Sequence, residues 1–305
     1  MEYIKKIIQS DPKKGKIFNL IMEKDRQCWR KFLGPDEIFK WLRNFSNEDE
    51  IYLALVLANN ILYYNLDEVR SLWRIILTNR VKLFLLDEIF RDIGLPDIEK
   101  WFPEYLREKC IFVGYGKAGK SGQSMVYPFQ QSHKGKNLKY MELFEFLHTS
   151  EDFSTKERVF LLDDFVGSGN QAKTTWYNKI ADKSFNDVSE ENPHLKFIYL
   201  ALIGFKDGKK VIEENTPMKV ILGEELDERF KCFSDVSVIY ENPNERIVAK
   251  RVMEEKGRML YEYPLGYDNM ELAVAFHHNT PNNSLPVIWK RRDDGSWYPL
   301  FERFE

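Results

Sequence analysis

The sequence is poor in cysteine, with three residues in a chain of 305, and this scarcity limits the kinds of protein it can be. Cys28, Cys110 and Cys232 are odd in number and widely spaced, and none belongs to a Cys-x-x-Cys pair. That pattern is not the framework of a disulfide-stabilised secreted domain. We therefore expect reduced thiols and an intracellular protein.

Long apolar runs and an excess of charge are missing as well. The first residues, MEYIKKIIQSDPKKGK, lack the apolar core of a secretory signal peptide, and no later run approaches the length of a transmembrane helix. Lys and Arg together number 45 against 48 Asp and Glu, a formal net charge of −3. Nothing in this total indicates a nucleic-acid or anionic-membrane surface, so we expect a cytoplasmic globular protein without a membrane partner.

What is present first is a helical pattern, from about residue 17 to residue 93. Pro35 with acids after it predicts a helix start, and Ser46 with Asp49 resembles a capping box for the next helix. Apolar stripes at helical spacing continue from there and are typical of a core face. The sequence predicts an all-helical N-terminal domain over residues 1–105, with a regulatory or interaction role.

The period then changes to short apolar runs separated by helical segments. The runs at 110–113, 159–162, 196–204 and 219–222 are typical of strands buried on both faces. Strands alternating with helices predict a parallel sheet flanked by helices. We expect this α/β domain to span residues 106–305.

The most informative stretch is VFLLDDFVGSGNQ, residues 159–171. Its apolar run predicts a strand that ends at two carboxylates, Asp163 and Asp164. A permissive glycine turn follows, and then a segment compatible with a helix. Because backbone N–H groups converge at such a turn and helix start, the stretch predicts an anion site with carboxylates beside it.

This stretch resembles the phosphoribosyl-diphosphate (PRPP) loop of type I phosphoribosyltransferases. The resemblance implies that Asp163 and Asp164 form the catalytic pair and meet the ribose hydroxyls and Mg²⁺. It also implies a 5′-phosphate site made by Phe165, Val166, Gly167, Ser168, Gly169 and Asn170. Where the family usually has Thr-Thr-Gly-x-Thr, this chain has Gly-Ser-Gly-Asn-Gln, so two hydroxyl donors to phosphate are missing.

A second glycine-rich loop, GYGKAGKSG, covers residues 114–122. It resembles the family's pyrophosphate loop, which would comprise Gly116, Lys117, Gly119, Lys120 and Ser121. The same letters satisfy the P-loop pattern GxxxxGK[ST] of nucleotide hydrolases, and this alternative stays open. Against it, Gly122 and Pro128 predict a poor helix start after the loop, whereas a P-loop needs one. The segment 130–139, which contains His133, would be either a mobile hood over the substrate or a solvated surface loop.

The last distinctive segment is HNTPNNSLP, residues 278–286. His277 and His278 are adjacent, would point apart on a strand and have no third ligand in view, so they do not indicate a metal site. The acceptor side of the predicted transferase is assigned to His278, Asn279, Asn282 and Asn283.

The tail, the helical half and the central loop together look like the phosphoribosyltransferase-like proteins of bacterial conflict systems, including effectors of retron reverse transcriptases. That resemblance implies an anti-phage effector that takes a phosphorylated ribose or nucleotide with Mg²⁺. A reverse transcriptase with its non-coding RNA, or another defence protein, would be its partner. A non-catalytic nucleotide sensor is the remaining alternative.

Overall fold

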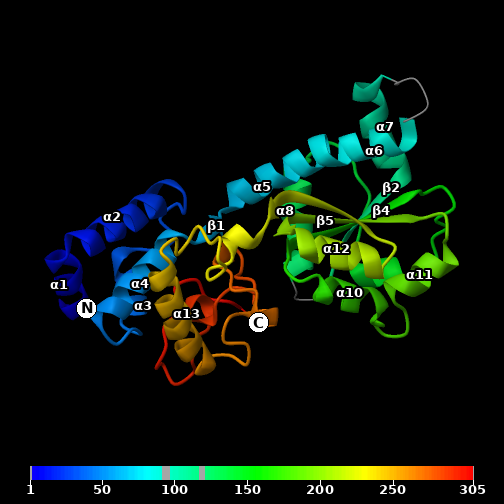
Figure 1. Ribbon diagram of the computed structural model, residues 1–305. Coiled ribbons are helices and arrows are strands. Elements are labelled where there is room, and N and C mark those ends of the chain that lie inside the picture. The colour runs from blue at the N-terminus through cyan, green and yellow to red at the C-terminus, as the bar shows by residue number, and fades with distance from the viewer. Residues whose placement is uncertain (1, 91–96, 117–120, 305) are drawn as a thin grey trace. The chain divides into compact units, whose positions relative to one another are not determined.

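The computed structural model describes residues 2–90, 97–116 and 121–304 (Figure 1). The chain forms two compact units: unit 1 contains Met1–Leu66 and Asp227–Glu305, and unit 2 contains Asp67–Leu226. This division differs from the expected boundary between residues 105 and 106. The helices after residue 66 belong to unit 2 because they pack on its other elements, as in the ring contact of Trp73 with Phe129 at 5.2 Å.

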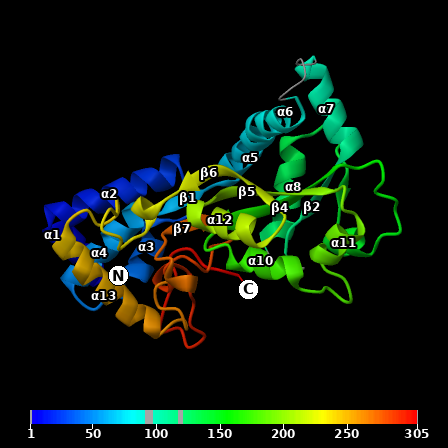
Figure 2. The same ribbon diagram turned by 45° about the vertical axis from the view of Figure 1, so that its right-hand side comes forward.

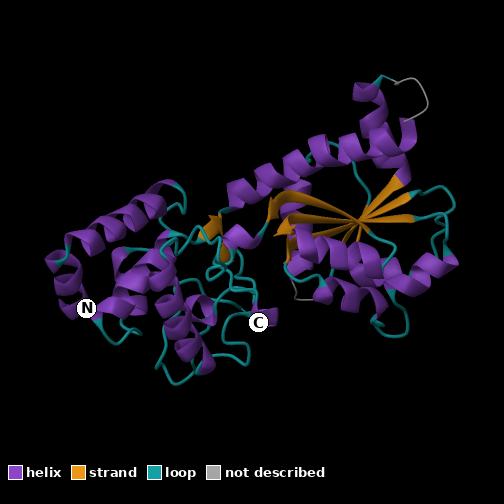
Figure 3. Cartoon of the chain, viewed as in Figure 1, coloured by secondary structure: helices purple, strands orange, loops and turns teal. Residues whose placement is uncertain are grey.

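Unit 2 is built on a five-stranded sheet in which every pair is parallel, in the order β3-β2-β4-β5-β6 (Figure 3). The strands are β2 (Cys110–Gly114), β3 (Tyr140–Met141), β4 (Arg158–Val166), β5 (Lys196–Phe205) and β6 (Lys219–Leu226). Every residue of β2 is buried, and so are nearly all residues of β4 and β5. Burial on both faces explains why these strands read as continuous apolar runs, and it confirms the predicted parallel sheet flanked by helices.

Helices cover both faces of this sheet. They are α5 (Leu66–Ile75), the π-helical turn η1 (Ile76–Val81), α6 (Lys82–Phe90), α7 (Ile98–Lys109), α8 (Ser121–Ser132), α9 (Leu143–His148), α10 (Asn170–Tyr177), α11 (Phe185–Glu191) and α12 (Lys206–Asn215). Alternate strand residues such as Leu161 and Phe197 share one core with Trp176 of α10 and Ile212 of α12. On the opposite face Phe112 packs on Phe129 of α8 at 5.1 Å. Both views show α10 and α12 on one side of the sheet and α8 on the other (Figures 1 and 2).

Unit 1 joins the two ends of the chain around a separate core. Its elements are α1 (Glu2–Ser10), α2 (Pro12–Gln27), α3 (Pro35–Leu42), α4 (Glu48–Asn59), β1 (Leu62–Tyr64), η2 (Glu228–Phe230), α13 (Pro243–Arg258), η3 (Tyr267–Asn269), β7 (Val274–Phe276) and α14 (Pro286–Trp289). Strands β1 and β7 pair in parallel, so the N-terminal region holds one short strand among the predicted helices. The cap expected at Ser46 lies one residue later, where the Asn47 side chain accepts from the Glu50 N–H at 2.9 Å. Among the described helices, none has both the length and the apolar character needed to span a membrane.

Candidate functional site

The strand order of unit 2 defines one position where ligands of open α/β sheets bind. The chain leaves β2 towards β3 on one side of the sheet and leaves β4 towards β5 on the other, although β2 and β4 are neighbours. Such a switch point places the loops after two adjacent strands side by side, outside their carboxyl ends. Here those loops are the two glycine-rich stretches singled out in the sequence. The topology therefore brings the predicted acid pair and the predicted pyrophosphate loop to the same edge of the sheet.

The acid pair lies within β4, not after it. The strand continues to Val166 because Phe165 and Val166 still pair with Ile203 and Gly204 of β5. The expectation that the strand ends at the two carboxylates is therefore wrong. Both acids are buried, with 6% of the surface of each exposed, and their side chains lie within hydrogen-bonding reach of each other.

Asp163 is buried on the face covered by α10 and α12, with 6% of its surface exposed. Its Oδ2 accepts a hydrogen bond from the Tyr199 hydroxyl at 2.5 Å, and its Oδ1 accepts from the Asp164 N–H at 2.9 Å. Burial, followed by the neighbouring Asp164 carboxylate, raises the pKa of Asp163 well above its usual value. The two predicted catalytic acids therefore form one buried pair.

The turn after β4 leads directly into a helix. Gly169 has φ = 82°, in the left-handed region that glycine adopts without strain, and it is the N-cap of α10. The Ser168 Oγ accepts from the Asn170 N–H at 3.4 Å. Because a glycine N-cap supplies no side-chain acceptor, backbone N–H groups of the first turn of α10 remain for an anion. This arrangement suits the predicted phosphate-binding residues Phe165 to Asn170.

A second glycine contact fixes the position of this turn. A Cβ atom added to Gly208, in the first turn of α12, would lie 2.0 Å from the Gly167 carbonyl oxygen. A Cβ added to Gly169 would lie 2.4 Å from the Gly208 carbonyl oxygen. The backbones of the turn and of α12 thus approach more closely than any side chain allows. Sequence reasoning missed Gly208, which has no neighbouring motif to mark it.

The second loop begins where β2 ends. The Tyr115 N–H donates to the Leu162 carbonyl at 2.8 Å, which extends the β2–β4 pairing by one residue, and Gly116 has φ = 120°. Lys117, Gly119 and Lys120 lie outside the described residues. Helix α8 begins at Ser121 and includes Pro128, so the expectation of a poor helix start is wrong. Helix α8 therefore follows strand β2 along the chain, which is the order that a P-loop also requires.

The segment after α8 is anchored in the core at His133. This side chain is 4% exposed, and its ring centroid lies 4.5 Å from that of Phe129, with the two rings tilted. Its Nδ1 lies 2.9 Å from the Phe129 carbonyl oxygen. Burial lowers the pKa of His133 to about 4, and the positive charges of Lys136 and Arg74 act in the same direction. His133 is therefore a core residue. It belongs neither to a mobile hood over the substrate nor to a solvated surface loop, the two alternatives given for segment 130–139.

We expect the burial of neutral His133 to make the stability of the protein depend on pH. An unfolded histidine titrates near 6.5, so the unfolded chain binds more protons between that pH and about 4. The free energy of unfolding should fall by about 2 kcal/mol from pH 7 to pH 5 through this residue. Urea unfolding of wild type and His133→Gln at both pH values measures the difference. The half-exposed His148, changed to Gln, is the control, and an equal pH dependence in all three proteins would contradict the expectation.

The predicted acceptor residues lie in unit 1, whereas the acid pair lies in unit 2. Asn279 holds the end of the chain, because its Oδ1 accepts from the Phe304 N–H at 3.1 Å and its Nδ2 donates to the Phe304 carbonyl at 3.0 Å. Asn283 donates to the Tyr267 carbonyl at 3.1 Å, and Asn282 accepts from the Tyr267 N–H through its backbone carbonyl. The ring of His278 lies 5.3 Å from that of Phe276. That His278, Asn279, Asn282 and Asn283 contact an acceptor stays a prediction.

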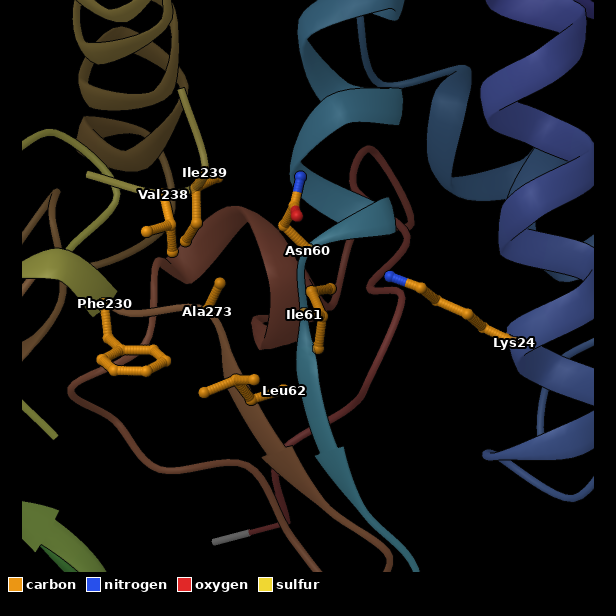
Figure 4. Close-up of a pocket in the computed structure, with 8 residues that line it drawn as sticks. All are labelled: Lys24, Asn60, Ile61, Leu62, Phe230, Val238, Ile239 and Ala273. Atoms are coloured by element: carbon orange, nitrogen blue, oxygen red, sulfur yellow. The ribbon is translucent and has the colours of Figure 1, made fainter. Parts of the chain in front are cut away.

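Two pockets lie away from the predicted residues. In unit 1 a cavity of about 140 Å³ is bordered by the facing side chains of Phe230, Leu62 and Ala273, and Lys24 reaches towards Ile61 from α2 (Figure 4). In unit 2 a cavity of about 270 Å³ lies at the amino ends of β5 and β6, the sheet edge opposite the acid pair. Neither lining contains a residue predicted for the site.

The acid pair and the glycine turn lie at the switch point of a doubly wound α/β sheet, the position where open sheets of this kind bind ligands. The chain belongs to the PRTase-CE family, which matches residues 38–303, and it is a phosphoribosyltransferase-like protein. The predicted resemblance to phosphoribosyltransferases and the predicted fold class are therefore confirmed.

Solved structures and curated proteins were also compared with the chain. The AQ2163 protein from Aquifex aeolicus is 14% identical with a TM-score of 0.26, over 62% of this chain and 82% of that one. Orotate phosphoribosyltransferase from Aeropyrum pernix is 11% identical with a TM-score of 0.26, over 49% of this chain and 72% of that one. No curated protein matches the chain.

Proposed function

We propose that this protein binds PRPP at the carboxyl ends of β2 and β4 and transfers its phosphoribosyl group to an acceptor. The observation that carries the proposal is the position of the acid pair and the Gly167-Ser168-Gly169 turn at the switch point of a PRTase-CE family sheet. Backbone N–H groups of the turn and of α10 would bind the 5′-phosphate. Asp164 would face the ribose.

In this reaction the protein does not have to form a covalent bond with the substrate. In phosphoribosyl transfer, pyrophosphate leaves C1 of the ribose with the bonding electron pair, and the acceptor forms the new bond to C1. Positive charge develops on the ribose ring while negative charge collects on the leaving group. A carboxylate beside the ring and N–H donors or lysines at the pyrophosphate stabilise that distribution, provided that they hold both reactants in place.

The donor set fits Mg²⁺ only as an ion held largely by the substrate. Among the described residues, no group of three or more His, Cys, Asp or Glu side chains is placed to hold a metal. The candidate ligands are the carboxylates of Asp163 and Asp164, and both oxygens of Asp163 already accept hydrogen bonds within the protein. Mg²⁺ is commonly bound by one or two carboxylates together with substrate phosphates and water. When bound, it would offset negative charge on the diphosphate.

Thermal unfolding with Mg²⁺ and either PRPP or ATP tests the proposal. We expect PRPP at 100 times its dissociation constant to stabilise the wild-type protein by about 2.7 kcal/mol, because the ligand binds only the folded state. The variant Asp163→Asn/Asp164→Asn should fold and lose this stabilisation. Pyrophosphate release in the presence of candidate acceptors then separates a transferase from a sensor, which would bind PRPP without turnover.

Because α8 starts at Ser121, the P-loop alternative stays open, and the same experiment tests it. A true P-loop would bind ATP through Lys120 and the N–H groups of the loop. Stabilisation by ATP alone, lost in Lys120→Ala and kept in the double aspartate variant, would overturn the phosphoribosyltransferase proposal.

A role as an anti-phage effector of a retron-type system belongs to the same proposal and rests on the resemblance of the sequence. Phage plating on cells that carry the complete defence system tests it. Protection should be lost when Asp164 is replaced by Asn at unchanged protein level. Full protection by that variant would separate the defence role from the proposed site.

A further inference from the structure

Unit 1 contains a cavity that the proposed PRPP site does not use. It measures about 140 Å³ and lies where α4 ends and β1 begins (Figure 4). Two of its apolar wall residues, Ala273 and Ile239, are buried, with 1% and 8% of their surface exposed. A third, Val238, is 46% exposed, so the cavity reaches the protein surface. Because an apolar cavity of about 150 Å³ can bind benzene, this one has room for a ring or a branched chain of that size.

Lys24 of α2 is the one charged residue among the described residues that line the cavity. Its Nζ points from α2 towards Ile61 (Figure 4). The ammonium donates a hydrogen bond to the Asn59 carbonyl, at the C-terminal end of α4. In the described part of the chain it forms no ion pair, and burial lowers the pKa of Lys24. The cavity is therefore bordered by a half-buried positive charge without a counter-ion from the protein.

A second lysine of α2 shows the partners that Lys24 lacks. Lys14 is also buried, and its Nζ lies 3.0 Å from Asp11 Oδ2 and 3.1 Å from Glu48 Oε2. Such pairing is the rule, because removing a charge from water is costly unless an opposite charge accompanies it. Lys24 has only a neutral carbonyl as its partner, which leaves two of its three N–H donors for a ligand.

We propose that this cavity binds a small monocarboxylate with an apolar body, whose apolar group fills the cavity and whose carboxylate pairs with Lys24. Charge complementarity selects this class of ligand, since the described lining residues carry one positive charge and no negative one. A dianion would bring a second negative charge that no lining residue matches. The walls come from both parts of unit 1, before residue 66 and after residue 227, so the ligand would join the two parts.

An NMR titration with benzoate as the probe tests the proposal on the full-length protein. We expect a dissociation constant of about 1 mM, a modest affinity for a ligand of this size. Benzyl alcohol has the same ring without the charge and should bind about tenfold more weakly or worse. Lys24→Met removes the charge and keeps an apolar chain, so its affinity for benzoate should fall by the same factor. Lys16→Met, an exposed change in the same helix, is the matched control and should bind benzoate as the wild type does.

Val238→Trp tests the cavity separately from the charge. Because Val238 is partly exposed, the larger side chain can cover the opening without overpacking the core, and we expect near wild-type thermal stability. Benzoate binding should be lost. The inference would be overturned if the wild type showed no saturable binding, if it bound benzyl alcohol equally well, or if either Lys24→Met or Val238→Trp kept full affinity. These results are independent of PRPP binding, because all the substituted residues lie in unit 1.

Discussion

Asp164→Asn is expected to remove most of the stabilisation by PRPP and Mg²⁺ while the protein still folds. At a PRPP concentration 100 times the wild-type dissociation constant, a hundredfold loss of affinity reduces the stabilisation from about 2.7 to about 0.4 kcal/mol. The loss has this size because hydrogen bonds to a charged group contribute about 1.5–3 kcal/mol each, and a shared Mg²⁺ adds to them. Differential scanning calorimetry with and without ligand measures it.

The matched control is Asp293→Asn, the same chemical change at an exposed aspartate of unit 1. That variant should respond to PRPP as the wild type does. Full stabilisation of Asp164→Asn by PRPP would mean that the carboxylate does not meet the ligand, and the site would then have to be sought elsewhere on the sheet edge.

Gly208→Ala is expected to have the largest effect on stability among single methyl additions in unit 2. The new Cβ would lie 2.0 Å from the Gly167 carbonyl oxygen, so either α12 or the turn after β4 has to move. Overpacking of this kind costs about 3 kcal/mol when backbone is the obstacle. Because the displaced turn is the proposed phosphate site, PRPP binding should weaken together with stability.

Thermal unfolding and PRPP titration of the same sample measure both effects. Lys210→Ala, an exposed change in the same helix, should leave both within the range of ordinary surface substitutions. Wild-type stability in Gly208→Ala would show that the two backbones do not approach so closely in solution.

Local patterns were sufficient to predict the strands of unit 2, because burial on both faces leaves a continuous apolar run in the sequence. These patterns failed where a residue far away in the sequence determines the local structure. Phe165 and Val166 extend β4 because β5 lies beside them, whereas the acids before them had suggested the end of the strand. The three-residue strand Leu62–Tyr64 has its partner more than two hundred residues away, and no window contains both.

The same limit applies to the site. The two acids and the glycine turn form one contiguous signal, and the structure places them at the carboxyl end of β4. Tyr199 and Gly208 have no such signal, since one lies within an apolar strand run and the other near the start of an unremarkable helix. Their contacts arise only when β5 and α12 pack beside β4.

The discontinuous course of unit 1 has a consequence for synthesis on the ribosome. Unit 2 is one uninterrupted stretch of chain and can fold as soon as it has emerged. The N-terminal helices cannot finish their core at that time: β1 needs β7, and the Trp41 indole N–H donates to the Val287 carbonyl at 2.7 Å. A polypeptide released early would therefore carry the sheet with its acid pair but leave the first 66 residues without the segment that completes their fold.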